Sequence, residues 1–141
     1  IAVGGAERVG MHRAPRCDAH TMGDSNPLAT FTYVVQALGK RNIAFICTRE
    51  AIGDDSISPA MKQAFGGFFI ANENFTAESA QQALDAGNAD AVAFGKAFIA
   101  NPDLPRRLQD NLPLNPPNFN TFYPMGAPDF AVGYTDYPFA E

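Results

Sequence analysis

Short apolar runs alternate with amphipathic segments along the first two-thirds of the chain. The apolar runs occupy residues 43–47, 68–71 and 91–94, and a segment with strand character runs from Arg8 to His12. Short, unbroken apolar runs bounded by polar and glycine-containing loops are typical of strands buried in a parallel sheet. The pattern therefore predicts four parallel strands.

Helices are expected between these strands. Apolar residues recur at helical spacing over residues 27–38, directly after the candidate caps Ser25 and Asn26, and Gly39 ends the pattern. Shorter helical patterns follow at 59–65 and 77–86, and Thr76 caps the second of these. The inward face of that helix is expected to carry Ala80, Ala83 and Leu84. Strands that alternate with helices predict an α/β fold whose helices cover the outer face of the sheet.

The number of strands leaves two architectures open. A complete (β/α)8 barrel takes roughly 250 residues, whereas four strands in 141 residues make up either half of such a barrel or a small open sheet. Because the chain begins with Ile1 rather than methionine and enters patterned sequence at once, we expect it to be a fragment of a longer protein.

The pattern changes after Asn101. A short basic helix is expected first, and residues 111–141 then form an irregular tail rich in proline and aromatic residues. Its aromatic residues are Phe119, Phe122, Tyr123, Phe130, Tyr134, Tyr137 and Phe139. A tail with this much apolar surface is expected to pack on the sheet unit rather than to act as a disordered linker. We therefore expect one partial barrel domain over residues 1–141.

Composition and charge exclude several classes of partner. The chain is 46% hydrophobic and 18% charged, as in ordinary globular domains, and its net charge of −5 offers no positive field to nucleic acid or anionic lipid. No apolar run approaches the roughly 18 residues that a membrane span needs, and no signal peptide opens the chain. We expect a cytoplasmic protein that binds neither nucleic acid nor membrane.

Cysteine and histidine spacing points to no metal site. Cys17 and Cys47 are 30 positions apart and are expected to be free thiols. Asp18 and His20 resemble a sparse metal pair, but further ligands at suitable spacing are lacking, so no metal is expected.

Two strand ends carry the candidate chemistry. Residues 72–74 (Asn-Glu-Asn) follow the third strand, and Gly95 with Lys96 follows the fourth. Ligands of parallel α/β folds gather at the carboxyl ends of strands, where glycine lets backbone N–H groups approach an anion and lysine supplies charge. The alternative is that Gly95 merely ends a strand and Lys96 is a surface side chain. Arg49 and Glu50 end the second strand near the same edge; the alternative is that these two side chains only pair with one another.

Five segments together resemble the old yellow enzyme family, and they occur in the family's order. They are residues 7–10 (ERVG), 24–28 (DSNPL), 90–96 (DAVAFGK), 99–104 (IANPDL) and 133–138 (GYTDYP). The family consists of FMN-containing, NAD(P)H-dependent ene-reductases of the N-ethylmaleimide reductase and 12-oxophytodienoate reductase type, which are built on a (β/α)8 barrel. The resemblance implies that this chain is the carboxyl-terminal half of such a barrel, with strands five to eight.

The resemblance also implies an FMN phosphate site. Gly95 and Lys96 match the family's Phe-Gly-Arg segment, which binds the phosphate, with lysine in place of the usual arginine. The loop of Asn72, Glu73 and Asn74 matches the other phosphate-side loop, in which many members have glycine at the position of Glu73. A carboxylate there would repel phosphate unless it points away, so the loop is expected to bind through backbone N–H groups.

His12 stands where the family has an arginine that contacts the flavin ring. Alternation along the strand directs Val9 and Met11 to the helix side and Gly10 and His12 to the barrel interior. Arg13 then lies on the wrong face, so His12 is the candidate flavin contact. The alternative is an ordinary histidine at a strand end.

Two further residues match the substrate side of the pocket. Tyr123, next to Phe122, matches an aromatic residue that lines this side in the family, although packing is the alternative role. No catalytic residue is assigned, because the family's substrate-anchoring His/Asn pair and its tyrosine proton donor would precede Ile1.

The resemblance thus implies part of an oxidoreductase that uses FMN, with NAD(P)H as reductant, to reduce activated alkenes. Hydride would pass to the flavin and then to the β-carbon of the alkene. The chain would need the missing amino-terminal half of the barrel as its partner and would be inactive alone. The alternative is a non-catalytic half-barrel that binds a phosphorylated ligand or a partner chain.

Overall fold

The computed structural model describes residues 1–2, 4–17, 22–123, 129 and 131–141, and it divides the chain into two compact units. The first unit is Ile1–Ala93 and the second is Phe94–Glu141. The described residues of the expected tail, 111–123, 129 and 131–141, belong to the second unit, whereas Phe130 lies outside the described residues; the packing of the tail on the sheet stays a prediction.

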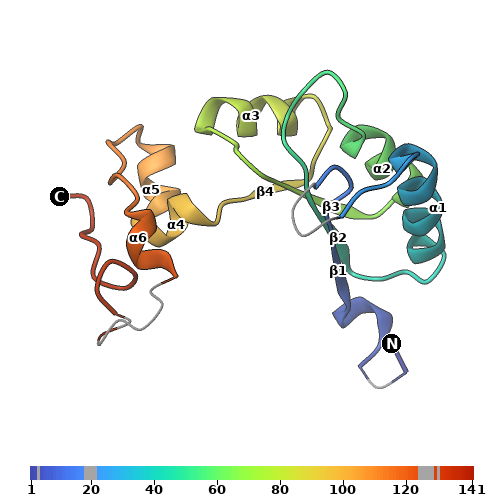
Figure 1. Cartoon of the computed structure of the whole chain (residues 1–141), viewed down its shortest axis with the longest axis horizontal. Coiled ribbons are helices and arrows are strands. Elements are labelled where there is room, and N and C mark those ends of the chain that lie inside the picture. Colours follow the sequence, from blue (N-terminus) through green and yellow to red (C-terminus); the bar gives the residue numbers. More distant parts are fainter. Residues whose placement is uncertain (3, 18–21, 124–128, 130) are drawn as a thin grey trace. The chain divides into compact units, whose positions relative to one another are not determined.

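The first unit is a parallel α/β structure (Figure 1). Its four strands form one sheet in the order β1-β2-β3-β4, and all neighbouring strands are parallel. The elements are η1 (Ala6–Arg8), β1 (Gly10–Arg13), α1 (Pro27–Gly39), β2 (Phe45–Arg49), α2 (Ser58–Phe65), β3 (Phe68–Asn72), α3 (Ala77–Asp85) and β4 (Ala91–Ala93). The α/β class and the four parallel strands are therefore confirmed.

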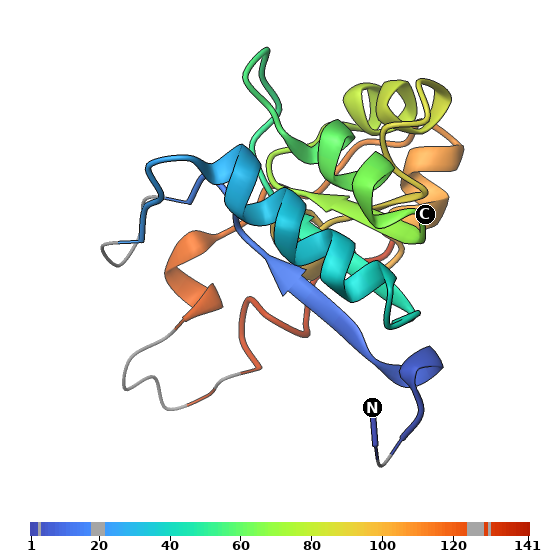
Figure 2. The same cartoon turned by 90° about the vertical axis from the view of Figure 1, so that its right-hand side faces the viewer.

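One face of the sheet carries the hydrophobic core. Met11, Ile46 and Phe69 are register partners on this face, and Ile46 and Phe69 are fully buried. Val35 of α1 and Met61 of α2, both completely inaccessible to solvent, pack onto them. Figure 2 shows α1 and α2 side by side over the sheet. This face supplies most of the hydrophobic stabilisation of the first unit.

The opposite face of the sheet is open. Gly10, Phe45 and Phe68 are register partners there, and Phe45 and Phe68 remain 37% and 50% exposed. A Cβ at position 10 would overlap the Phe45 ring, so Gly10 makes room for that ring. The predicted alternation is confirmed, since Met11 packs against the core while His12 lies exposed on the open face.

Local signals set the helix ends. Asn26, rather than Ser25, caps α1 by accepting a 3.2 Å hydrogen bond from the N–H of Ala29. Thr76 and Ser79 form a reciprocal capping box at the start of α3. Gly66 ends α2 with φ 70°, a left-handed conformation that glycine adopts without strain.

Several boundaries differ from the sequence predictions. The first strand was predicted from Arg8, but Arg8 belongs to the 3-10 turn η1, and β1 begins only at Gly10. The second strand was predicted from Ile43, which is buried but lies before the start of β2 at Phe45. On α3, Ala80 is buried as predicted, whereas Leu84 is 36% exposed. The predicted inward face of this helix is therefore only partly right.

The described part of the second unit contains three short helices. They are α4 (Lys96–Ala100), α5 (Leu104–Gln109) and α6 (Phe119–Phe122). The predicted basic helix after Asn101 is confirmed as α5, which carries Arg106 and Arg107. Helices α4 and α6 were not predicted.

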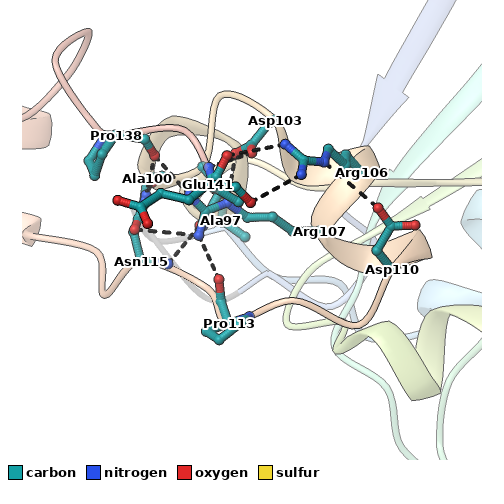
Figure 3. A network of polar contacts seen from close by, with 12 residues as sticks. Ala97, Ala100, Asp103, Arg106, Arg107, Asp110, Pro113, Asn115, Pro138 and Glu141 are labelled. Carbon is teal, nitrogen blue, oxygen red and sulfur yellow. Dashed lines mark hydrogen bonds and ion pairs between the residues drawn. The ribbon is translucent and has the colours of Figure 1, made fainter.

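Arg107 organises the polar interior of the second unit (Figure 3). Its guanidinium, only 5% exposed, donates to the Asp103 carboxylate at 2.6 Å and to the carbonyl oxygens of Pro113 and Pro138 at 2.5 and 2.8 Å. The other carboxylate oxygen of Asp103 accepts from the N–H of Ala140 at 2.8 Å. The last residues of the chain are thereby tied to α5.

Among the residues that the structure describes, no helix has both the length and the apolar character that crossing a bilayer would require.

Candidate functional site

The carboxyl ends of β2, β3 and β4 form the first half of the candidate site. Arg49, Asn72 and Ala93 are register partners at this edge. The Asn72 side chain donates to the Ala93 carbonyl oxygen at 2.7 Å, and the N–H of Glu50 donates to the Asn72 carbonyl oxygen at 3.0 Å. The base of the loop that follows β3 is therefore fixed by hydrogen bonds on both sides.

This loop, residues 72–74, is called the phosphate-side loop below. Glu73 has φ 103° and Asn74 has φ 57°. Positive φ is uncommon for residues with a side chain; asparagine tolerates it better than most, and glycine adopts it freely. The loop thus follows a glycine-type path with a glutamate at the position where glycine is common in the resembled family.

The Glu73 carboxylate is paired with Arg49. Arg49 Nε lies 2.7 Å from Glu73 Oε2, and Arg49 Nη2 lies 3.4 Å from Oε1. The side chains are 47% and 22% exposed. The negative charge that would repel a phosphate is therefore partly cancelled by a guanidinium on the neighbouring strand.

The alternative in which Arg49 and Glu50 pair with one another is wrong. Successive side chains of a strand point to opposite faces. Arg49 accordingly lies on the open face beside Asn72, whereas Glu50 is buried and accepts hydrogen bonds from Ser58 and from Arg16, with Arg16 Nε at 2.7 Å.

Glu50 is a structural carboxylate. Burial raises its pKa, but hydrogen bonds from the Ile57 N–H, the Ser56 hydroxyl and Ser58 oppose this, so that the pKa lies below its ordinary value. Its contacts hold the loop between β2 and α2 and the start of α2.

Gly95 and Lys96 belong to the second unit. A Cβ on Gly95 would meet no atom of the described chain within 4 Å, so the space beside this backbone is open. Lys96 Nζ lies 5.6 Å from the centroid of the Phe119 ring, within range of a cation–π interaction. Gly95 and Lys96 are both exposed. This exposure agrees both with a ligand contact and with the alternative of a strand end followed by a surface lysine.

His12 lies beside Cys47 on the open face of the sheet. The two are register partners of β1 and β2. Burial raises the pKa of the Cys47 thiol, and Cys17 and Cys47 are both free, as predicted. Arg13 lies on the helix-covered face, and its buried Nε has no hydrogen-bond partner among the described residues. The face assigned to His12 is confirmed, while its contact with a flavin stays a prediction.

Phe122 and Tyr123 have different environments. Phe122 is 5% exposed and packs edge-on against Phe119, with ring centroids 5.6 Å apart. Tyr123 is 87% exposed. Of the two, Tyr123 has the side chain that is available to a ligand.

The candidate residues fall into two groups. The phosphate-side loop and His12 belong to the first unit; Gly95, Lys96, Phe122 and Tyr123 belong to the second. The sequence analysis missed the pairing of Arg49 with Glu73. Asp18 and His20, the weak metal pair, lie outside the described residues, and the residues that are described contain no cluster of three metal-ligating side chains.

Comparison with known proteins identifies relatives over nearly the whole chain. Arabidopsis thaliana 12-oxophytodienoate reductase 2 is 40% identical over 146 residues, which cover 97% of this chain and 38% of that protein. The solved structure of morphinone reductase has 40% identity and a TM-score of 0.87, over 99% of this chain and 38% of that one. The old yellow enzyme homologue from Zymomonas mobilis has 37% identity and a TM-score of 0.88, over 98% of this chain and 40% of that one.

The chain thus spans about two-fifths of the length of these relatives. Residues 2–115 match the sequence profile of the NADH:flavin oxidoreductase / NADH oxidase family. Old yellow enzymes of this family are (β/α)8 barrels that use FMN with NAD(P)H as reductant. The resemblance expected from the sequence is confirmed, and the chain belongs to the NADH:flavin oxidoreductase / NADH oxidase family, in its old yellow enzyme branch.

Proposed function

We propose that this chain forms strands five to eight of an FMN-dependent (β/α)8 barrel that reduces activated alkenes with NAD(P)H. The open sheet face carries the proposal: Phe45 and Phe68 are 37% and 50% exposed on it, while helices cover the other face. An interior barrel face needs such residues, because the remaining strands cover it. The complete flavoprotein would combine this chain with the amino-terminal half of the barrel.

The phosphate group of FMN would be held by Gly95, Lys96 and the backbone of the phosphate-side loop. Two observations fit this ligand: the space beside Gly95 is open, and the carboxylate of Glu73 is paired with Arg49. Lys96 would supply a positive charge without the bidentate fork of an arginine. FMN, when bound, supplies the hydride-transfer chemistry.

Other residues would orient the cofactor and the substrate. His12 would hydrogen-bond the flavin ring from the open face of the sheet, and Tyr123 would line the substrate side, where the buried Phe122 would support this wall by packing. The proton that completes alkene reduction would come from the amino-terminal half, since none of these residues is assigned as its donor.

The phosphate site can be tested by substituting Gly95 and Lys96, one at a time, in the complete flavoprotein. Gly95→Val should weaken FMN binding more than Lys96→Ala, because the valine side chain fills the open space and blocks the approach of phosphate to the backbone. Losing the lysine should cost about 1.5–3 kcal/mol, the range of a hydrogen bond to a charged group. Fluorescence quenching during FMN titration of the apoprotein measures both.

Gly23→Val is the matched control, because a Cβ at Gly23 also meets open space and should leave FMN binding unchanged. Riboflavin, which lacks the phosphate, should lose much less affinity than FMN in the Gly95→Val protein. Unchanged FMN affinity in both site variants would remove this site. Retained binding of other phosphorylated ligands without any flavin binding would favour the non-catalytic half-barrel.

A further inference from the structure

The phosphate-side loop has an unfavourable backbone conformation at a residue with a long side chain. Glu73 has φ 103° and is followed by Asn74 at φ 57°. Such a conformation persists when surrounding contacts over-determine it. Glu73 lacks the conformational freedom of glycine, so we expect its side-chain contacts to stabilise this backbone conformation.

Arg49 is placed to provide such contacts. It is the last residue of β2 and the register partner of Asn72, the last residue of β3. The hydrogen bond from Glu50 N–H to the Asn72 carbonyl oxygen, 3.0 Å long, continues the pairing of the two strands to the loop. From this fixed backbone, Arg49 reaches Glu73 with Nε and Nη2, at 2.7 and 3.4 Å. A two-point contact restricts both the position and the rotation of the carboxylate.

The pair also sets the charge of the loop. A phosphate carries close to two negative charges near neutral pH, so an unpaired carboxylate in a loop that binds it would oppose binding. Arg49 offsets that charge and directs the carboxylate toward β2. Arg49 and Glu73 therefore do together much of what a glycine at position 73 would do alone: they stabilise the left-handed backbone and offset part of the negative charge of the loop.

We propose that Arg49 is a positioning residue of the FMN phosphate site, which acts by holding Glu73 and with it the phosphate-side loop. This inference rests on the proposed function, because it assigns the loop to the FMN phosphate. It makes Arg49 necessary only while residue 73 is glutamate.

The test compares Arg49→Ala, Glu73→Gly and the double variant in the complete flavoprotein. Arg49→Ala should weaken FMN binding on the order of tenfold, because it removes the guanidinium that offsets the Glu73 carboxylate and helps to hold the loop. Riboflavin affinity should stay unchanged. Glu73→Gly should bind FMN at least as well as the unmodified protein, and it should abolish the effect of Arg49→Ala in the double variant. Arg41→Ala is the control, since it removes the same charge from an exposed arginine that donates to Ala37 of α1.

Hydrogen exchange of the amides of residues 73–75 in the flavin-free protein is the second readout. Exchange should be faster in Arg49→Ala than in Arg41→Ala. The proposal is overturned if Arg49→Ala weakens FMN binding by the same factor with glutamate or glycine at position 73, since Arg49 would then contact the phosphate itself. It is also overturned if loop exchange is unchanged. If neither the unmodified protein nor any variant binds flavin, the proposed function fails. The hydrogen-exchange rates of the loop amides then decide alone whether Arg49 holds the loop.

Discussion

At the residue scale, the face on which a side chain lies was predictable, but its partner was not. Strand alternation placed His12 and Met11 on opposite faces of the sheet, and the structure confirms both. The pairing of Arg49 with Glu73 depends on the register of β2 against β3 and on the turn after Asn72. Register is a property of two strands together, so the local pattern of one strand contains no signal for it.

Tyr123 and Phe122 allow a test of the substrate wall at single residues. Tyr123→Ala should lower alkene turnover in the complete flavoprotein while leaving flavin reduction by NAD(P)H intact, because its side chain is 87% exposed and no flavin contact is assigned to it. Its effect on the free energy of unfolding should stay within about 0.5 kcal/mol. Stopped-flow absorbance and urea denaturation measure these quantities.

Phe122→Ala is the contrasting variant. Phe122 is 5% exposed, so its truncation should destabilise the protein by about 3–5 kcal/mol. If Tyr123→Ala instead causes loss of flavin or prevents its reduction, Tyr123 does not belong to the substrate wall.

At the element scale, the sequence predicted those helices and strands that carry their own signals. Helices α1 and α3 each have a capping residue and an apolar face in the local sequence, and β2 and β3 each begin with a continuous apolar run. Helices α4 and α6, of 5 and 4 residues, were missed because helices this short are not stable by themselves. Tertiary contacts stabilise them, such as the Asn115 side chain, which donates to the Ala100 carbonyl oxygen at 2.8 Å.

The connection between β2 and α2 depends on the charge of Glu50. Because hydrogen bonds hold the pKa of Glu50 below its ordinary value despite burial, its contribution to stability is complete above the pKa of the unfolded carboxyl. The contribution is lost as pH falls from that value through the lower native pKa. Glu50→Gln should therefore reduce the free energy of unfolding by about 1.5–3 kcal/mol at pH 7.

Urea denaturation of the complete protein at a series of pH values measures this difference. The gap between the unmodified protein and Glu50→Gln should close as the carboxyl is protonated in acid. The lowered pKa of Asp90, caused by Lys62 and by the Phe69 N–H, affects both proteins alike and cancels in the comparison. A gap that is independent of pH would mean that Glu50 acts through its shape rather than its charge.

At the scale of the whole molecule, the four predicted strands could not decide between half a barrel and a small open sheet. The distinction lies in what covers the second face of the sheet, and no local pattern specifies that. In the first unit, Phe45 and Phe68 on that face, together with the relatives that are more than twice as long, favour the half-barrel. The 141 residues alone should therefore behave as an incomplete structure.

The chain produced alone is expected to associate and to lack both flavin and activity. The edge strands β1 and β4 offer unpaired backbone groups, and exposed phenylalanines on the open face favour contact with a second copy. Full orientation of the flavin and delivery of the proton would also need groups of the amino-terminal half, and binding that leaves the reacting atoms unoriented does not accelerate the reaction. On gel filtration the chain should elute colourless and larger than a 15.1 kDa monomer, without NAD(P)H-dependent alkene loss.

Two variants separate association through the open face from association elsewhere. Phe68→Ser should shift the chain toward the monomer, because Phe68 is 50% exposed on that face, whereas Tyr33→Ser should not, although Tyr33 of α1 is 74% exposed. Equal effects of the two substitutions would mean that the open face does not drive association. A yellow, monomeric and active preparation of the 141 residues would contradict the half-barrel itself, because these residues would then hold the flavin and supply the proton without the remaining strands.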